Sequence, residues 1–492
     1  MSERTTRPRL PKAVKSPAFL LFAALSCIGS VFALAQPPYG VSDEPAHAVK
    51  ALATARLQLS GPEVLGQFDY PAIDYDVPLA YSSIWHMVCY SSNTDATPDC
   101  APDFPSDRTV GPVSSTAGTY PPLYYFIVGQ LGWPSPGLTG IISMRLASVV
   151  LNALVLTATF MALRRIASRT AATTAIFLGY TPTVLAMGSS VNPFGFEVSC
   201  FFLIWALASP MASHTTEIPR SNRRLVLLWI ASLAVAFIRP MSFIWTLGIA
   251  AILAGLSRVS SRNQPGSAAT RVRQDLTFAL PLIVSACLSI AWWLIAAPGS
   301  SYGGSGQGFG ALGRNLRYSF DRLDDYLLQL HSYFGWTEFY GPLFSLLLWI
   351  AAFVVFSTCH PFHKRLKMAL LGLVALFVAA PLALEGARAT SVGFGYQGRY
   401  ILPLFVGLPV LVLTFQVRHY RESTKQSRTA FILVLVATLT STIHLVRRYS
   451  VGLSGELLWF TESTSEPYAG TNLQMVLLMT GFGIPYLIAR SE

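Results

Sequence analysis

Residues 17–47 read PAFLLFAALSCIGSVFALAQPPYGVSDEPAH, and this stretch decides how the rest of the chain is arranged. Its apolar part, residues 17–36, has about the ~20 residues that a helix needs to cross a bilayer. Basic residues precede it, and a turn-forming Pro-Pro-Tyr-Gly leads into the acidic motif Asp43-Glu44-Pro45-Ala46-His47. We therefore expect a membrane span that carries this motif out of the cytoplasm. Residues 33–35, Ala-Leu-Ala, also fit a signal-peptide cleavage site, but the apolar run is long for one, so we expect a retained anchor.

The whole chain is too apolar for a soluble protein. Of its 492 residues 52% are hydrophobic and 12% are charged, about half the charged fraction of soluble domains. The mean hydropathy is +0.48. We expect an all-α polytopic membrane protein with about twelve transmembrane helices, within a range of 11–13. The candidate spans are 17–36, 139–162, 170–188, 194–212, 225–238, 241–257, 276–298, 342–358, 368–384, 400–416, 429–446 and 472–489.

The distribution of charge gives the orientation. With a cytoplasmic N-terminus, 23 of the 35 basic residues but only 5 of the 24 acidic residues fall in cytoplasmic segments. This pattern follows the positive-inside rule, so the net charge of +11 reports topology, and nucleic-acid binding is excluded. We expect a multi-pass protein of the bacterial cytoplasmic (inner) membrane with both termini cytoplasmic. Arg239-Pro240 separates two short spans, 225–238 and 241–257, which could also be one kinked element; we keep them separate because one long span would spoil the charge pattern.

One transmembrane domain, residues 1–492, accounts for the whole sequence. After the first span, an extracytoplasmic loop at 37–136 is expected to carry interfacial amphipathic helices, one over 45–59 and one following Tyr120-Pro121-Pro122. Residues 60–118, rich in Pro, Asp, Ser and Gly, read as an ordered loop. Spans 2–7 occupy 139–298, a second outer loop 299–341, and spans 8–12 residues 342–489. No cytoplasmic segment is long enough for a domain.

Two cysteines, Cys89 and Cys100, share the first outer loop. In an oxidising compartment we expect them to form a disulfide, which stabilises the loop by roughly 2–3 kcal/mol on the loop-entropy model. Metal binding by this pair is the weaker alternative because no Cys-x-x-Cys spacing occurs. No metal-ligand set can be read anywhere in the sequence.

The acidic motif is the sharpest candidate for chemistry. Asp43 and His47 lie one helical turn apart, and partial burial can raise the pKa of a carboxylate for proton transfer. The alternative is that Ser42 or Asp43 caps a helix whose first turn holds Glu44. The two interpretations are compatible.

Polar residues gather at the outer ends of several spans. A charge at bilayer depth costs on the order of 2.5–3.5 kcal/mol, so such residues usually face a partner or a polar cavity. Single arginines more often extend to the headgroups, but the set favours a shared polar site in which arginines would bind a phosphate. Outer aromatic residues would stack on sugar rings or anchor the protein at the interface. The polar set is Arg145, Asn192, Glu197, Arg239, Glu385, Arg388 and Arg399, and the aromatic set is Trp85, Tyr120, Tyr124, Trp336 and Tyr396.

Five short motifs occur in order: residues 43–47 (DEPAH), 120–125 (YPPLYY), 190–193 (SVNP), 334–336 (FGW) and 397–400 (QGRY). One span, a large outer loop that opens on an acidic motif, a helix led by Tyr-Pro-Pro and a span that opens with Arg145 together resemble the GT-C superfamily of polyprenyl-phosphate-sugar glycosyltransferases. The five motifs resemble more closely the uncharacterised bacterial membrane family called domain of unknown function 2142, in an actinobacterial form. The chain departs from the pattern at Glu338, where we expect Asp, and at Phe194, where we expect a polar residue.

The resemblance implies an inverting hexosyl- or pentosyltransferase that acts on the extracytoplasmic face in cell-wall biogenesis. The expected partners are a polyprenyl-phosphate-linked sugar, a cell-envelope glycan or lipid acceptor, and the bilayer. It implies catalysis by Asp43 or Glu44 with His47, and donor-phosphate binding by Arg399, Arg388 and Arg145. Some members of the superfamily use a divalent cation. The alternative is a transporter or flippase of a lipid-linked saccharide. Expected substrate-binding residues are Tyr120, Tyr124, Asn192, Glu197, Trp336, Glu338 and Gln397.

Overall fold

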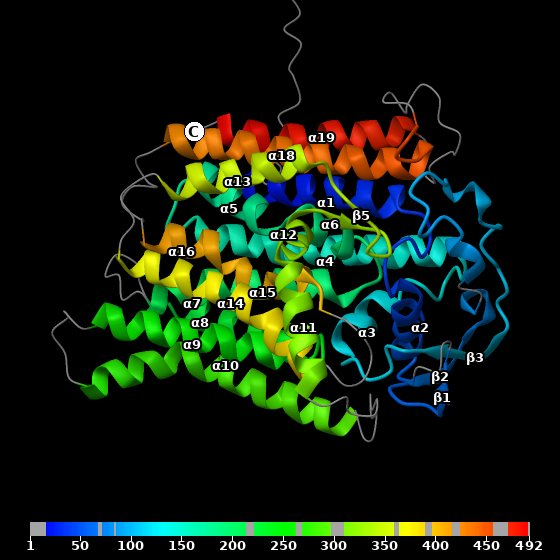
Figure 1. Ribbon diagram of the computed structural model, residues 1–492, viewed down its shortest axis with the longest axis horizontal. Helices are drawn as coiled ribbons and strands as arrows, with labels where there is room; N and C mark the ends of the chain where they lie inside the picture. Colours follow the sequence, from blue (N-terminus) through cyan, green and yellow to red (C-terminus); the bar gives the residue numbers. More distant parts are fainter. Residues whose placement is uncertain are drawn as a thin grey trace, which may run out of the picture.

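The computed structural model describes residues 16–66, 71–82, 85–212, 221–261, 268–296, 309–358, 364–388, 396–415, 424–455 and 471–490. Most of these residues are helical, and the long helices run roughly side by side (Figure 1). A smaller unit of helices and strands lies at one end of the bundle; its described residues belong to the predicted outer loop 37–136, which we call the first outer segment. The C-terminal end of the last helix lies at the opposite end.

The helical body begins with α1 (Pro17–Ala35), which packs against α4 and α19. Gly29 permits the approach to α4, because a Cβ at this position would lie 2.7 Å from the Val149 Cγ1 atom. The remaining helices of the body are α4 (Leu138–Leu163), α5 (Arg169–Gly179), α6 (Pro182–Gly188), α7 (Pro193–Ala212), α8 (Asn222–Ala236), α9 (Ser242–Ser261), α10 (Ala268–Ala296), α13 (Leu343–Ser357), α14 (Lys364–Arg388), η6 (Gly398–Ile401), α15 (Leu402–Phe405), α16 (Gly407–Phe415), α18 (Thr424–Val451) and α19 (Thr471–Arg490).

Six apolar stretches of the described chain are helical and long enough to cross a membrane, and a seventh is the pair α5–α6, bent by 75°. These seven coincide with the predicted spans 17–36, 139–162, 170–188, 194–212, 276–298, 400–416 and 429–446. Shorter apolar helices occupy 242–258, 343–357, 370–383 and 473–489. The segment around Arg239 contains two helices, α8 and α9, as expected, while the total of twelve spans stays a prediction.

The first outer segment is more ordered than the sequence predicted. Its elements are α2 (Glu44–Ala55), β1 (Glu63–Leu65), β2 (Pro71–Pro78), η3 (Leu79–Tyr81), η4 (Trp85–Val88), η5 (Pro98–Cys100), β3 (Val110–Ser115) and α3 (Leu123–Gly129). The three strands form an antiparallel sheet with β2 in the centre, where a loop was expected. Lys50 of α2 reaches this sheet and donates to the Tyr75 hydroxyl over 2.7 Å.

The expected membrane-surface position of α2 is wrong. Every residue of α2 except Ala46 is buried, because the helix lies between α3 and the sheet. Helix α3 is different, since Phe126 and Ile127 are 44% and 38% exposed while Tyr124 and Tyr125 are buried. One face of α3 is therefore apolar and uncovered, as an interfacial helix requires.

The second outer segment contributes α11 (Phe309–Asp321), α12 (Leu323–His331) and a two-stranded hairpin, β4 (Tyr333–Phe334) with β5 (Phe339–Tyr340). Its tip contacts the turn between α1 and α2. The backbone N–H of Ser42 donates to the Gly335 carbonyl, and the Trp336 indole N–H donates to the Tyr39 carbonyl over 2.8 Å. The hairpin thus holds the turn that carries the acidic motif.

Candidate functional site

The turn between α1 and α2 has an unusual backbone. Tyr39 and Asp43 have positive φ values of 63° and 65°, and Thr337 in the facing hairpin has 65°. Residues other than glycine rarely adopt this region, and such strained positions concentrate at functional sites. Asp43 is exposed and precedes α2 without capping it through its side chain. The capping interpretation of Asp43 is therefore wrong, and its carboxylate is left accessible.

Glu44 forms a buried ion pair with Arg145 of α4. The Arg145 Nε and Nη2 atoms donate to the two Glu44 carboxylate oxygens over 2.8 and 2.6 Å. Nη1 and Nη2 also donate to the carbonyls of Ala33, Gln36 and Pro37. Arg145 is 1% exposed and Glu44 is fully buried. We call this pair with its three carbonyl partners the Arg145 anchor.

The Arg145 anchor corrects two expectations. All five N–H groups of the guanidinium have acceptors in the protein, so Arg145 is not available to a phosphate. Glu44 also accepts from the Val191 backbone N–H over 2.9 Å, so both of its oxygens are engaged. It therefore acts as a structural link between α1, α2, α4 and the segment before α7, and not as a free base.

His47 lies one turn after Asp43 and is buried. Its Nδ1 atom is 2.7 Å from the Tyr125 hydroxyl, and its ring packs edge-on against Tyr120. Burial, together with the positive charges of Arg239 and Arg399, lowers the pKa of His47 from 6.5 to about 3. The imidazole is therefore neutral at pH 7, and its low basicity makes it a poor general base.

Arg239, between α8 and α9, joins the site through Glu197 of α7. Its Nη1 atom is 2.8 Å from Glu197 Oε2, and the Ser242 hydroxyl donates to Glu197 Oε1. Burial raises the pKa of the Tyr120 hydroxyl, and the nearby charges of Arg239 and Asp43 act on it in opposite directions. Tyr120 is thus near both the carboxylate of Asp43 and the guanidinium of Arg239, whose charge is balanced by Glu197.

Arg399 in η6 is buried without a comparable partner. It is 4% exposed, its Nη1 atom contacts the Met187 sulfur over 3.2 Å, and its Nε has no hydrogen-bond partner in the described part of the chain. Among the described residues no carboxylate forms an ion pair with it. The guanidinium lies 5.8 Å from the ring centroids of Phe194 and Tyr400. Since Arg239 stacks on the same Phe194 ring at 5.3 Å, the two arginines share one aromatic surface.

Two expected substrate-binding residues have structural contacts instead. Tyr124 is fully buried, with its hydroxyl 2.6 Å from Ser148 Oγ and within hydrogen-bond distance of the Ser190 carbonyl. Asn192 accepts from the Phe194 backbone N–H over 2.9 Å at the start of α7. Both side chains therefore shape the break before α7.

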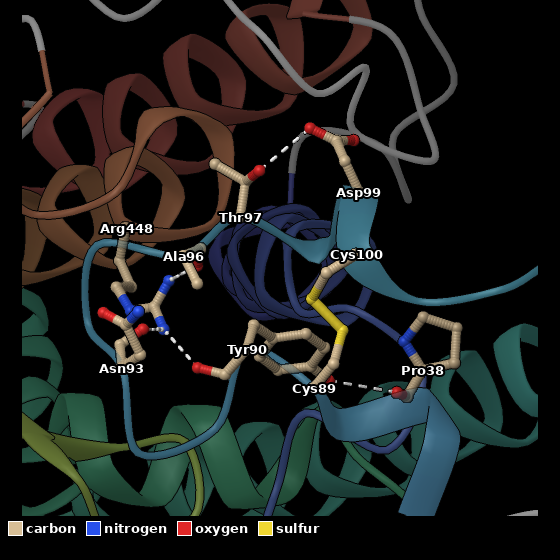
Figure 2. The surroundings of a disulfide bond; sticks show 9 residues. All are labelled: Pro38, Cys89, Tyr90, Asn93, Ala96, Thr97, Asp99, Cys100 and Arg448. Atoms are coloured by element: carbon tan, nitrogen blue, oxygen red, sulfur yellow. Dashed lines mark hydrogen bonds between the residues drawn. A yellow bond between two sulfur atoms is a disulfide. The ribbon is translucent and has the colours of Figure 1, made fainter.

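The loop closed by the disulfide contacts the turn that precedes Asp43. Cys89 and Cys100 are bonded, as expected from the sequence, with a Cα–Cα distance of 6.1 Å. Arg448 of α18 donates to three carbonyls of this loop (Figure 2). The Tyr90 hydroxyl donates to the Pro38 carbonyl over 3.2 Å, which links the loop to the turn before Asp43.

Glu338 and Gln397 lie at the border of this arrangement. Glu338 accepts from the Ser92 backbone N–H over 2.6 Å, and burial raises its pKa. Its other oxygen has no hydrogen-bond partner within the described ranges and is 4.0 Å from Arg448 Nη2. Gln397 precedes η6 without a side-chain capping hydrogen bond, and its buried Oε1 has no hydrogen-bond partner among the described residues. Glu338 therefore holds the disulfide loop to the hairpin, and within the described residues it forms no ion pair with Arg239 or Arg399.

The structure thus brings together Asp43, His47, Tyr120, Glu197 and Arg399 from the predicted set. Arg239 also belongs to this site, although the sequence had indicated it only as a charge at the end of a span. Phe194 and Tyr400 form the aromatic surface of the site. Trp336 serves the hairpin contact described above. The side chains of Arg388, Glu385 and Trp85 lie outside the described residues.

A divalent cation does not fit the described residues. No group of three or more His, Cys, Asp or Glu side chains in the described part of the chain could hold a metal ion. Asp43 is the one carboxylate of the motif with free oxygens, since Glu44 is committed to the Arg145 anchor.

The helices and their long apolar stretches define a polytopic α-helical membrane protein. A sequence model described as "Predicted membrane protein (DUF2142)" matches residues 26–408, and the chain belongs to this family. No curated protein sequence matches it.

Two solved structures show an overall similarity. ArnT from Cupriavidus metallidurans bound to undecaprenyl phosphate is 13% identical, with a TM-score of 0.45 over 96% of this chain and 77% of that chain. The Archaeoglobus fulgidus oligosaccharyltransferase in complex with zinc and sulfate is 12% identical, with a TM-score of 0.40 over 90% of this chain and 54% of that chain. Similarity at this level does not by itself assign an activity.

The Arg145 anchor predicts that Glu44→Gln destabilises the protein by about 3 kcal/mol, because removal of one partner leaves a buried charge unpaired. The measurement is the free energy of unfolding in detergent. Glu63→Gln is the control, since Glu63 is exposed at the edge of the sheet and should change stability by less than about 0.5 kcal/mol. Equal stability of Glu44→Gln and wild type would rule out the anchor.

The pKa of His47 predicts a pH effect on stability. Between pH 6.5 and pH 3 the unfolded chain binds a proton at this residue that the folded protein does not. The folded state should therefore lose stability as the pH falls, by at most about 1.4 kcal/mol per pH unit. His47→Gln removes this contribution. Unfolding of both proteins at pH 7, 6, 5 and 4 checks it, and a stability difference independent of pH would contradict the shift.

Proposed function

We propose that the protein is a GT-C-type membrane glycosyltransferase that moves a sugar from a polyprenyl-phosphate donor to a cell-envelope glycan or lipid acceptor on the extracytoplasmic face. One observation carries the proposal. Asp43 has an accessible carboxylate, and Arg399 is a buried arginine with no carboxylate partner among the described residues. Both lie near the small group of residues around His47 and Tyr120.

Arg399 supplies the argument for an anionic ligand. Burial of a cation is costly unless a counter-charge compensates it, and Arg239 obtains that compensation from Glu197 whereas Arg399 has no such partner among the described residues. A phosphate group would provide the missing acceptors, because the guanidinium fork matches two phosphate oxygens. We infer that Arg399 binds the donor phosphate and that Arg239 holds Tyr120 in place.

We assign Asp43 as the general base because the other two candidates in the motif, Glu44 and His47, are excluded. Glu44 has both oxygens engaged, and His47 has a pKa near 3. The positive φ of Asp43 directs an acidic side chain away from the capping position and leaves it accessible. Such strain is retained only where the surrounding contacts impose it, and here the Arg145 anchor and the hairpin supply those contacts.

The proposed step is a single inverting displacement. The acceptor hydroxyl oxygen forms a bond to the anomeric carbon while Asp43 takes the hydroxyl proton. The bond between the anomeric carbon and the phosphate oxygen breaks, and its electron pair leaves with the polyprenyl phosphate. Arg399 stabilises the negative charge that develops on this leaving group. No step passes through a metal ion.

Asp43→Asn should abolish transfer without unfolding the protein. Asparagine adopts positive φ values readily, so stability should stay within about 0.5 kcal/mol of wild type, while loss of a general base lowers the rate by 10²–10⁴. The assay follows label from polyprenyl-phosphate sugars into envelope acceptors. Asp103→Asn, an exposed carboxylate in the same outer segment, is the control. Wild-type transfer by Asp43→Asn would disprove the base assignment.

The same assay in sealed vesicles separates the enzyme from a flippase. Label that crosses the membrane while it stays on the lipid would favour the transporter. Label that leaves the lipid for the acceptor without crossing would favour the enzyme.

Arg399→Met tests the phosphate role. Methionine keeps the apolar contacts with Met187 and Phe194 but removes the charge, so we expect donor binding to weaken at least about tenfold, a change of about 1.4 kcal/mol. The thermal midpoint should stay equal or rise because an uncompensated buried charge is removed. Arg317→Met, whose side chain is 85% exposed, is the control. A large loss of stability with unchanged donor binding would show that Arg399 is structural.

A further inference from the structure

The disulfide closes a loop whose backbone carbonyls bind a buried arginine. Cys89 and Cys100 are 11 positions apart in the sequence, and we call residues 89–100 the disulfide loop. Arg448 of α18 is fully buried and donates to three carbonyls inside this loop over 2.7–3.0 Å (Figure 2). The three carbonyls are those of Tyr90, Asn93 and Ala96. Burial of the guanidinium therefore depends on a conformation that the disulfide restrains.

The same loop grips the turn between α1 and α2. The Tyr90 hydroxyl donates to the Pro38 carbonyl over 3.2 Å, and the Tyr449 hydroxyl, at the end of α18, donates to the Gly40 carbonyl over 3.2 Å. The two rings meet edge-on with their centroids 5.9 Å apart. The two carbonyls flank Tyr39, whose φ of 63° is strained. Such strain persists only where contacts impose it, so the disulfide loop helps to maintain this turn.

A second connection runs through the β4–β5 hairpin. The Ser92 backbone N–H, inside the loop, donates to Glu338 Oε2 over 2.6 Å. The hairpin in turn accepts the Ser42 backbone N–H at the Gly335 carbonyl. The loop therefore reaches the residues next to Asp43 by two routes, one direct and one through the hairpin.

The disulfide itself is accessible, although the groups that it positions are not. Cys89 and Cys100 are both exposed, whereas Tyr90 and Arg448 are buried. Exposed disulfides undergo thiol–disulfide exchange more readily than buried ones. Breaking the bond gives the loop more open conformations to occupy. The conformation in which its carbonyls converge on Arg448 then becomes less populated.

We propose that the Cys89–Cys100 disulfide is a redox switch for the turn that carries Asp43. A thiolate of a dithiol reductant attacks one cystine sulfur, the S–S bond breaks and a mixed disulfide forms. The second thiol of the reductant then displaces the protein sulfur. The reductant supplies two electrons and two protons and leaves as a cyclic disulfide, while both cysteines become thiols.

Reduction weakens the hold of the loop on Arg448 and on Pro38, and the turn relaxes. The relaxed turn no longer fixes Asp43. Regulation of sugar transfer in this way rests on the proposed function, but the loosening of the turn does not.

The test uses the full chain in detergent, oxidised or reduced with dithiothreitol, and measures hydrogen exchange by mass spectrometry. We expect the backbone amides of residues 39–43 to exchange at least about tenfold faster in the reduced protein, because the loop is no longer closed. Amides of residues 198–208, inside α7, should exchange at the same rate in both states.

Three variants control the comparison. The double variant C89S/C100S should exchange like the reduced wild type, with or without dithiothreitol. Tyr90→Phe keeps the disulfide but removes the hydrogen bond to the turn, so the turn should exchange faster even in the oxidised protein. Thr97→Val removes a hydroxyl that bonds to Asp99 within the loop and should behave as wild type.

Three results would overturn the proposal. Equal exchange of the turn in the oxidised and reduced proteins would show that the loop does not control it. Faster exchange throughout, α7 included, with a lower thermal midpoint would show a disulfide that only stabilises the fold. A disulfide that stays closed in dithiothreitol would show that it does not switch.

The transfer assay separates this switch from the proposed function. Reduction should slow transfer at least about tenfold without weakening donor binding, because the base is misplaced while Arg399 is not. Equal transfer before and after reduction would show that the switch does not regulate it. No transfer by the oxidised protein, together with a loosened turn after reduction, would contradict the proposed function and still support the switch.

Discussion

The candidate site depends on the guanidinium of Arg145. This one group binds the carbonyls at the end of α1, the carboxylate at the start of α2 and, through Glu44, the backbone before α7. A charge can be buried this deeply only because every N–H group has an acceptor. The turn that holds Asp43 is fixed at both ends by these contacts, so the backbone strain at Asp43 is maintained by the anchor beneath it.

Arg239 and Arg399 are close together, yet their different partners indicate different roles. Arg239 and Arg399 both contact the Phe194 ring, yet Arg239 has Glu197 at 2.8 Å, whereas the Met187 sulfur is the only hydrogen-bond partner of the Arg399 side chain among the described residues. The charge of Arg239 is balanced by Glu197 within the described protein, so Arg239 can orient its neighbours. No carboxylate of the described residues balances the charge of Arg399, and this is why we propose it for the donor phosphate. Phe194, which departs from the expected polar type, is therefore useful as an apolar surface that both cations can contact.

Hydropathy and charge distribution were enough to predict the main helices, because a bilayer imposes both their length and their flanking charges. The same reasoning placed Asp43, His47 and Arg399 near one another, since the ends of spans on one side of a membrane must meet. It failed for Glu44 and Arg145, which are 101 residues apart in the sequence. A charge at a span end looks the same in sequence whether it binds a ligand or another buried charge.

The three-stranded sheet was missed for a different reason. Its central strand, residues 71–78, begins and ends with proline and carries two aspartates, a composition that indicates a loop. Its alternation is visible only when Tyr75 and Val77 are seen packed inward. The burial of α2 could not be predicted either, because the sheet that covers it had not been recognised.

The docking of the disulfide loop has a consequence for the order of assembly. This loop belongs to the first hundred residues, but Arg448, which binds three of its carbonyls, lies in one of the last helices. The hairpin that holds the Asp43 turn is also made late in synthesis. The outer segment therefore has to wait for most of the chain to be inserted before it can complete its contacts. Asp43 acquires its final environment only when α18 is in place, so a truncated or incompletely inserted chain cannot present a finished site.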